Sequence, residues 1–273
     1  MYGHAFVDNE SGGGRRFARA TAQNPAMDPN FDREKAAALV ARCSRLDLLD
    51  FEAALDDMCS LCFLQPQRAF RQAYYRKQTK NAWARDDPAF CVVQVGFIMV
   101  AATAYGVALG ARHPLAFAWI WMLAVLLHWL VGGVAAATAT AGFANGALVE
   151  RGRNDRVEWL YAFDVHCNAF FAAFLVGSVG LYLLLPVALG HSYLAMAVAN
   201  SVYLVAAAAY FYVMHLGFRA LPFLHSTECF LYPVVALMGC LLVSLVLGAF
   251  GLKVNVLRIL VMGLLGARPS VLE

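Results

Sequence analysis

The chain has 273 residues, of which 61% are hydrophobic and only 14% are charged, against roughly 45–50% and 25% in soluble globular domains. This composition excludes an ordinary soluble enzyme. The formal net charge of +3 is too small to indicate a nucleic-acid partner by itself. The apolar residues fall in separate runs, each near the roughly 20 residues that cross a bilayer as a helix. The sequence therefore predicts an all-α, polytopic membrane helix bundle.

The N-terminal part of the chain is the most polar. Residues 1–30 lack hydrophobic periodicity, which predicts a disordered tail. From Asp32 to Cys62, apolar residues recur at three- and four-residue spacing while acidic residues such as Asp57 occupy other faces, which predicts an amphipathic helix. Pro66 should interrupt it, and a basic and aromatic segment then continues toward Arg85. Residues 31–89 are expected to form a cytoplasmic helical region.

Five apolar runs follow within residues 90–250, and each is expected to cross the membrane. They are Phe90–Leu109, Leu115–Ala137, Ala169–Leu189, Tyr193–Leu216 and Phe230–Phe250. In residues 251–273, the run Val254–Leu265 is too short to cross easily and contains Arg258, so we interpret it as a short apolar segment followed by a tail. Lysine and arginine gather before the first span and in the loops after the second and fourth. This bias predicts a cytoplasmic N-terminus and a lumenal C-terminus.

The densest polar stretch runs from Tyr75 to Phe90, directly before the first span. Pro88 can start that span, and the acidic pair before it lies where a helix dipole favours anions. The stretch can be a positive flank with a helix cap, a docking surface for anionic lipid or a cytosolic protein, or an RNA-binding surface, since basic and aromatic side chains together hold phosphates and stack bases. The candidate binding residues here are Arg76, Lys77, Lys80, Trp83, Arg85, Asp86 and Asp87.

A second polar stretch, from Glu150 to Asn168, separates the second and third spans. Ionisable residues near hydrocarbon are costly and often functional. The candidate binding residues in this stretch are Glu158, Trp159, Asp164 and His166. An alternative is a membrane-embedded enzyme or ion-coupled transporter that uses Asp164, His166, His128 and Glu228. The alternate spacing of Asp164, His166 and Asn168 does not place all three on one helix face, however.

Known catalytic patterns give no further candidates. No Ser-His-Asp order, phosphate-binding glycine loop or paired-carboxylate constellation stands out. We therefore predict no enzyme, no cofactor, no metal ligand and no catalytic residue.

Three stretches resemble the signature of the Unc-fifty family of eukaryotic Golgi membrane proteins. They are YRKQTKNAWARDDPAF at 75–90, VEWLYAFDVHCNAF at 157–170 and LGFRALPFLHSTECFLYP at 216–233. Asp50-Phe51-Glu52 also fits the opening pattern of that family. The chain departs from the pattern in its glycine-rich N-terminus, its alanine-rich spans and its extension after Phe250.

The resemblance implies a five-span protein of Golgi and early secretory membranes, with the endoplasmic reticulum and inner nuclear membrane as further locations. In animals the family is linked to assembly and surface delivery of nicotinic acetylcholine receptors. A yeast relative is a partner of large Arf guanine-nucleotide exchange factors, and RNA binding has been proposed for a mammalian member. We therefore expect a non-enzymatic trafficking factor whose partners are Golgi membrane lipids, Arf exchange factors and membrane-protein cargo.

Overall fold

The computed structural model describes residues 29–43, 45–62, 66–150, 152 and 155–265. Nearly all of the predicted tail, residues 1–30, lies outside this range. Among the described residues there are helices, turns and loops but no strand, and one isolated antiparallel bridge joins Val149 to Leu224. The all-α prediction is confirmed.

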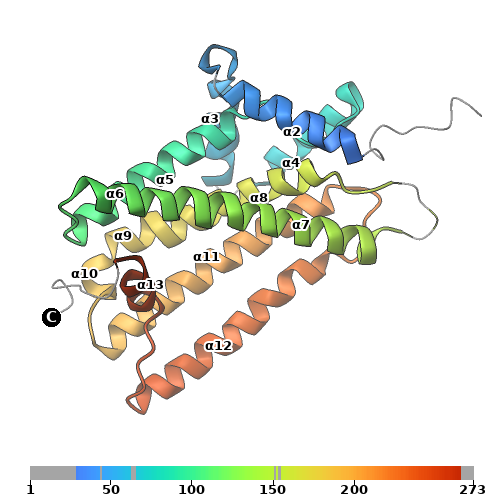
Figure 1. Cartoon of the computed structure of the whole chain (residues 1–273). Helices are drawn as coiled ribbons and strands as arrows, with labels where there is room; N and C mark the ends of the chain where they lie inside the picture. Colours follow the sequence, from blue (N-terminus) through green and yellow to red (C-terminus); the bar gives the residue numbers. More distant parts are fainter. Residues whose placement is uncertain (1–28, 44, 63–65, 151, 153–154, 266–273) are drawn as a thin grey trace, which may run out of the picture.

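Five helices are long and apolar enough to cross a membrane, which confirms the predicted polytopic bundle (Figure 1). They are Ala89–Ala108 (α5), Pro114–Leu148, Trp159–Leu183, Tyr193–Arg219 (α11) and Thr227–Ala249. The second is built from α6 (Pro114–Trp121), a π-helical stretch (Met122–Val131), α7 (Gly132–Phe143) and a second π-helical stretch (Ala144–Leu148). The third contains α8 (Trp159–Phe174), a π-helical stretch (Leu175–Gly180) and α9 (Leu181–Leu183). The fifth contains a 3₁₀ turn (Thr227–Leu231) and α12 (Tyr232–Ala249).

Two spans differ in extent from the sequence prediction. The second was expected to end at Ala137 but continues to Leu148, and the third was expected to begin at Ala169 but begins at Trp159. The polar residues at the start of α8 led the prediction to place this segment outside the helix. They are compatible with a packed helix because neighbouring elements supply their hydrogen-bond partners, as described below.

Three helices form a cap across one end of the bundle (Figure 1). They are α2 (Pro29–Cys43), α3 (Phe51–Cys62) and α4 (Pro66–Lys80), with a short 3₁₀ turn at Leu46–Leu48. The single amphipathic helix predicted from Asp32 to Cys62 is thus broken in two. Asp50 explains the restart, because its Oδ1 accepts a hydrogen bond from the Ala53 amide at 3.0 Å and so caps α3.

The linker from the cap to the first span comprises residues 81–88. The helix predicted to run toward Arg85 ends at Lys80, because Asn81 adopts the left-handed conformation with φ 52°. Asparagine tolerates that conformation at a helix end better than most residues. Arg85 therefore lies in the linker, which folds back along the bundle.

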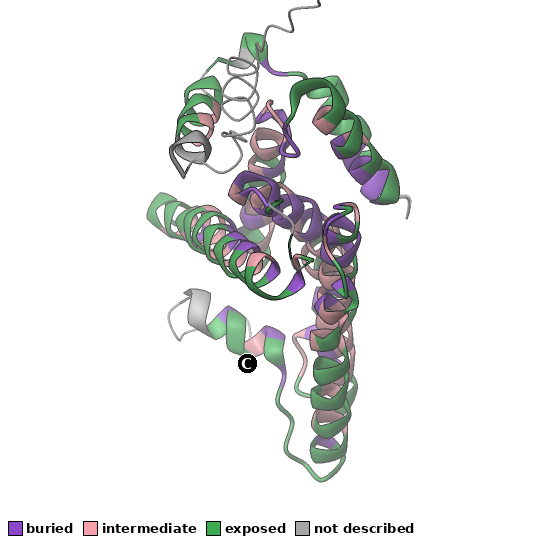
Figure 2. Cartoon of the chain, turned by 90° about the vertical axis from the view of Figure 1, so that its right-hand side faces the viewer, coloured by how far each residue is buried: buried purple, intermediate pink, exposed green. Residues whose placement is uncertain are grey.

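Helix α8 lies at the centre of the packing. It contacts α7 and α11 in the membrane and α2 and α3 in the cap. Ala162, Val165, Cys167 and Ala169 on this helix have no exposed surface. Buried residues gather toward the middle of the molecule, while exposed residues cover much of the outer helices (Figure 2). Gly217 on α11 permits a close approach to α8, since a Cβ there would lie 2.6 Å from the Val165 side chain.

The far end of the bundle, opposite the cap, is closed by two short helices, α10 (Leu185–Ala188) and α13 (Val256–Leu265). Leu257 and Val261 of α13 are buried in a small apolar cluster with Leu181 and Ala188. With ten residues, α13 is shorter than the roughly 20 residues needed to cross a bilayer. The short apolar segment predicted at Val254–Leu265 therefore packs on the end of the bundle.

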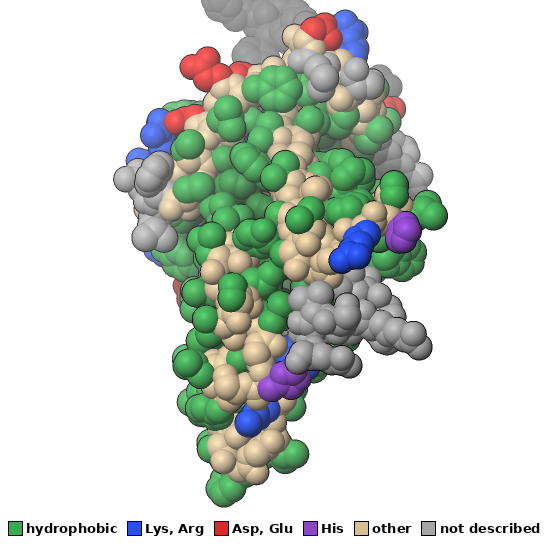
Figure 3. Space-filling view, turned by 90° about the vertical axis from the view of Figure 1, so that its left-hand side faces the viewer, with side chains coloured by type: hydrophobic (Ala, Val, Ile, Leu, Met, Phe, Trp, Pro, Cys, Tyr) green, Lys and Arg blue, Asp and Glu red, His purple; other side chains and the backbone are tan. Residues whose placement is uncertain are grey.

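The outer surface of the spans is apolar, as expected where lipid replaces water. Figure 3 shows hydrophobic side chains over most of one face, with acidic side chains gathered at the top of the view over the cap. Helix α12 is the least buried span, and only 6% of its most apolar stretch lies inside the structure.

Candidate functional site

The candidate site is a network of charged side chains where the cap meets the bundle. Its centre is Arg85 in the linker. The Arg85 guanidinium donates to Asp164 Oδ1 through Nη1, and through Nη2 to Asp57 Oδ2 at 2.8 Å and Asn168 Oδ1 at 3.0 Å. Its backbone amide donates to Asp164 Oδ2 at 3.3 Å. The side chains of Arg85, Asp164 and Asp57 are only 13%, 12% and 7% exposed, so the network is shielded from water.

Three separate elements supply this network. Asp57 comes from α3 in the cap, Arg85 from the linker, and Asp164 and Asn168 from α8. Because Asp164 and Asn168 are four residues apart, they share one face of α8. His166 lies between them in sequence and contacts a different helix, in agreement with the spacing argument.

A second pair of contacts extends the network along α4. Arg76 Nη2 lies 3.6 Å from Asp164 Oδ2 and donates to the Trp83 carbonyl at 3.3 Å. Lys77 Nζ lies 3.9 Å from Glu158 Oε1, which also accepts from the Trp83 amide at 3.4 Å. Two basic residues of α4, Arg76 and Lys77, thus contact Asp164 in the third span and Glu158 directly before it. The backbone of Trp83 bonds a member of each pair.

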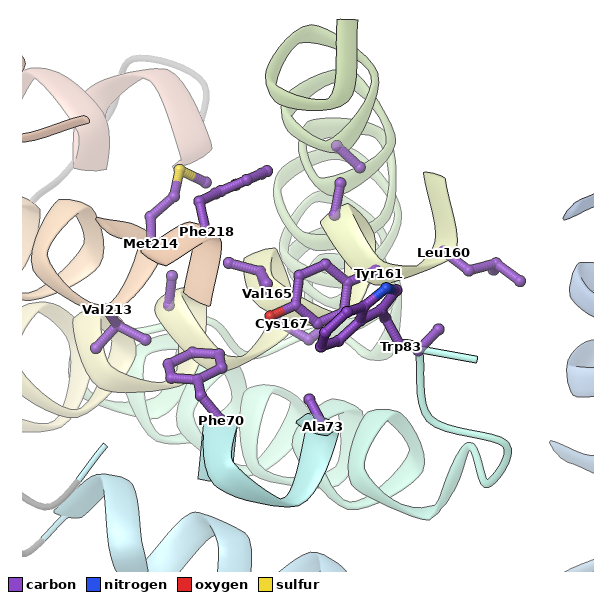
Figure 4. Close-up of a cluster of buried hydrophobic side chains, with 14 of the residues drawn as sticks. Phe70, Ala73, Trp83, Leu160, Tyr161, Val165, Cys167, Val213, Met214 and Phe218 are labelled. Carbon is purple, nitrogen blue, oxygen red and sulfur yellow. The ribbon is translucent and has the colours of Figure 1, made fainter. Parts of the chain in front are cut away.

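Trp83 is the apolar counterpart of this network. Its ring is buried, and ring centroids of Tyr74, Tyr161 and Phe223 lie 6.2 to 6.3 Å away. Figure 4 shows Trp83 beside Tyr161, with Phe70 and Ala73 of α4 facing the same cluster. The rings meet in tilted or edge-to-face contacts, which add to the stabilisation from burial alone.

Burial and charge act against each other on Arg85. Burial by itself lowers the pKa of the guanidinium, but the carboxylates of Asp164 and Asp57 together raise that pKa above its ordinary value. Arg85 therefore keeps its charge in the folded protein. A buried charge that loses its partner is strongly destabilising, typically by about 3–5 kcal/mol. Docking of the cap on the bundle therefore depends on the few charged side chains of this network.

The acidic pair before the first span lies at the rim of the network. Asp86 forms an ion pair with Lys80 at 2.7 Å, and its carbonyl accepts from Arg42 at 2.7 Å. Asp87 accepts from the amides of Asp50 and Ala89 at 2.7 and 2.9 Å. The N-cap of α5 is Pro88, which makes no side-chain cap bond, and the Asp87 carboxylate lies beside this helix N-terminus, where the helix dipole favours anions.

The other candidate residues lie in separate surroundings. His166 Nδ1 forms a hydrogen bond with the Tyr210 hydroxyl at 2.7 Å. His128 Nδ1 donates to the carbonyl of Leu123 in its own helix at 2.8 Å, and Glu228 is exposed. Within the described ranges no group of three His, Cys, Asp or Glu residues could hold a metal ion. The shared constellation that motivated an enzyme or transporter reading is not formed by these residues.

The predicted binding residues divide by exposure. Lys80 is exposed, while Arg76, Lys77, Arg85, Asp86, Asp87, Trp159 and Asp164 are partly buried and Trp83, Glu158 and His166 are buried. Their role in binding lipid or a partner stays a prediction. Their contacts within the chain are those described above.

Sequence reasoning missed Asp57 and Asn168 as members of the network. Asp57 was grouped with the solvent-facing acids of an amphipathic helix. Asn168 was considered only for its alternate spacing with Asp164 and His166. Its four-residue spacing from Asp164 was the available signal.

Together, the five-span bundle, its docked cap and the buried arginine network define a multi-pass α-helical membrane protein. Residues 39–261 match the UNC-50 family. The chain is 38% identical over 204 residues to "Protein unc-50 homolog" of Dictyostelium discoideum, covering 73% of this chain and 78% of the relative. Identity to the Homo sapiens "Protein unc-50 homolog" is 39% over 211 residues, covering 76% and 80%.

"Protein unc-50" of Caenorhabditis elegans is 35% identical over 201 residues, covering 73% of this chain and 66% of that protein. No solved structure matches the chain. The chain belongs to the UNC-50 family, which confirms the resemblance found in its three signature stretches.

Proposed function

We propose that this protein is a non-enzymatic trafficking factor of Golgi and early secretory membranes. In this proposal the cap recruits large Arf exchange factors from the cytosol, and the bundle supports transport of membrane-protein cargo such as receptors to the cell surface. The observation that carries the proposal is the attachment of the cap to α8 through Arg85, Asp57 and Asp164. A cap fixed in this way presents a preformed surface beside the membrane, which lowers the ordering cost of binding a partner.

The surface available to a partner is the outer face of α4. Arg68, Arg71, Tyr74 and Tyr75 are exposed there. Arginine and tyrosine are enriched at the centres of protein interfaces because they combine large contact areas with directional hydrogen bonds. This face, rather than the buried members of the network, is where we expect direct contact with an exchange factor.

The charge distribution supports a cytoplasmic cap. All seven ion pairs among the described residues lie at the cap end. At the far end, the described lysines and arginines are Arg112, Lys253 and Arg258. Because positive residues tend to stay in the cytosol, the proposal places the cap in the cytosol and the far end in the lumen.

The proposal is tested in cells that lack the endogenous protein and express either the wild type or the variant R71Q/Y75S. Both side chains are exposed, so the fold should be retained. We expect less Arf exchange factor on Golgi membranes and slower arrival of a receptor at the cell surface.

The matched control is R112Q, which removes a positive charge at the far end and should leave recruitment unchanged. Proximity labelling from the N-terminus should enrich Arf exchange factors, and labelling from Glu273 should not. Equal recruitment by the wild type and R71Q/Y75S, or enrichment of a metabolic enzyme complex instead, would contradict the proposal.

A further inference from the structure

An apolar groove of about 320 Å³ lies between α2 of the cap and the spans α5, α7 and α8. This volume is at the lower end of the roughly 300–1,000 Å³ found for small-ligand sites. Its walls are almost wholly apolar: Ala36, Leu39, Val40, Trp129, Val134 and Phe163 are among the lining residues. The polar network forms the end of the groove, where Arg85, Asp87 and Asp164 line it.

The groove lies at the expected edge of the bilayer. Counting roughly 20 residues for a crossing from Pro114, the start of the second span, reaches the vicinity of Gly133. Trp129 and Val134 are on either side of that position. Phe163 contacts the Trp129 ring and stacks on Trp159, with ring centroids 6.2 and 5.6 Å apart, and tryptophan is enriched at membrane–water boundaries.

The groove is open toward lipid on one side. Leu130 and Val134 line it and are also exposed on the outer surface of their span. In a membrane, such a surface is covered by hydrocarbon chains. A chain of a neighbouring lipid can therefore enter the groove sideways, without passing through water.

A basic ledge adjoins the groove on the cap side. A second cavity of about 190 Å³ shares Leu39, Arg85 and other walls with the groove and is also lined by Lys35 and Arg42. These two residues are seven positions apart on α2 and so lie on one helix face. The bond from Arg42 to the Asp86 carbonyl uses Nη1, and a guanidinium has five N–H donors.

The carboxylates beside the groove and the ledge already have partners within the chain. Asp86 pairs with Lys80, Asp164 pairs with Arg85, and Asp87 accepts from two backbone amides. Cations of the chain thus compensate the charges of Asp86 and Asp164, and the Asp87 carboxylate is held by neutral amides. The ledge consequently favours an anionic group over a cationic one.

From this juxtaposition we propose that the groove and ledge bind one anionic phospholipid of the surrounding leaflet. One acyl chain occupies the groove between α2 and α7, and the phosphate lies at the Lys35–Arg42 ledge. Helix α2 then serves as the cover of a lipid site as well as part of the cap. This inference does not depend on the proposed role in trafficking.

The test uses the purified full chain in lipid nanodiscs that contain phosphatidylserine with a photoactivatable diazirine in its acyl chain. After illumination, mass spectrometry maps the labelled peptides. We expect labelling on α2 and around Trp129–Val134, and at least about fivefold more of it with phosphatidylserine than with a phosphatidylcholine probe of the same chain, because each basic residue near a membrane surface favours anionic lipid by about this factor.

Two pairs of variants sharpen the test. V134W fills the groove and should reduce labelling there to background, whereas V131W changes an exposed residue of the same span that does not line the groove and should not. R42Q should reduce the preference for phosphatidylserine, and R45Q, whose partner Asp47 is also exposed, should leave it unchanged.

A36F fills the groove from the opposite wall and provides a second variant if V134W does not fold, as judged by thermal unfolding. Unchanged groove labelling in a folded filling variant would overturn the proposal. Equal labelling by the two lipid probes, or an unchanged lipid preference in R42Q, would do the same.

Discussion

The two ends of the bundle are held together by different kinds of polar contact. At the cap end, ionised side chains pair in a shielded network around Arg85. At the far end, neutral amides make the contacts: Asn200 bonds Ser244, the Val254 carbonyl and the Val256 amide at 2.8 to 3.0 Å, and Asn255 donates to the Ala188 carbonyl at 2.8 Å. In both cases polar contacts attach a segment outside the spans to the bundle: the cap at one end and the segment that leads into α13 at the other.

The difference follows from the cost of burying charge. A buried ion pair compensates a large desolvation penalty, so removal of one partner leaves an uncompensated charge. A buried amide compensates a much smaller penalty. Docking of the cap should therefore be more sensitive to a single substitution than docking of α13.

The largest effect is expected for R85M. This change leaves the buried Asp57 carboxylate without its guanidinium partner and leaves Asp164 with only the longer ionic contact to Arg76, so we expect a loss of about 3–5 kcal/mol in the free energy of unfolding. Thermal unfolding in detergent micelles measures it, and protease cleavage in α3 should accelerate in parallel. A stability equal to the wild type would show that the network does not hold the cap.

A smaller effect is expected for N200L at the far end. The change removes three hydrogen bonds and leaves the backbone groups of Val254 and Val256 without this partner, for a loss of about 3 kcal/mol or less. Labelling of a cysteine introduced at Leu257 should become faster as α13 undocks, while cleavage of the cap should not change. Parallel loosening of the cap would indicate that the two ends are not independent.

The close contact between α11 and α8 at Gly217 predicts a packing effect. In G217A the new methyl group meets the side chains of Val165 at 2.6 Å and Phe70 at 3.0 Å, so we expect a loss of about 2 kcal/mol. G239A on α12 is the control, because nothing lies within 4 Å of a Cβ there. Similar unfolding temperatures for the two variants would contradict the close packing of α11 on α8 and α4.

No measurable effect is expected for R68Q. Arg68 and Asp56 form an ion pair at 3.3 Å, but both side chains are about half exposed, and such pairs contribute little to stability. The unfolding temperature should match that of the wild type. A large drop in the unfolding temperature would show that exposed ion pairs on the cap contribute as much to stability as the shielded pairs beneath the cap.

Much of this architecture is predictable from sequence because hydrocarbon imposes a simple rule. Long apolar runs must become helices, and all five were predicted. The boundaries of α8 were not, because Asp164 and Asn168 suggest a loop until their partner Arg85 is known. The break before α3 was also missed, although Asp50 is a typical helix-capping residue.

The candidate site was predictable only in part. The basic and aromatic stretch from Tyr75 to Phe90 was singled out correctly as a dense cluster, but its pairing with α3 and α8 is a long-range property. Arg85 contacts residues 28 and 79 positions away. The periodicity of a single sequence indicates on which face of its own helix a residue lies. It does not indicate which distant part of the chain packs against that face.

A double-mutant cycle between Arg85 and Asp164 is the most direct test of how the cap is held. The free energy of unfolding is measured for the wild type, R85M, D164L and the double variant in the same detergent. If the two side chains form a shielded pair, the double variant is less destabilised than the sum of the single variants, by at least about 1 kcal/mol. Effects that add to within about 0.5 kcal/mol would contradict the ionic attachment of the cap to the bundle.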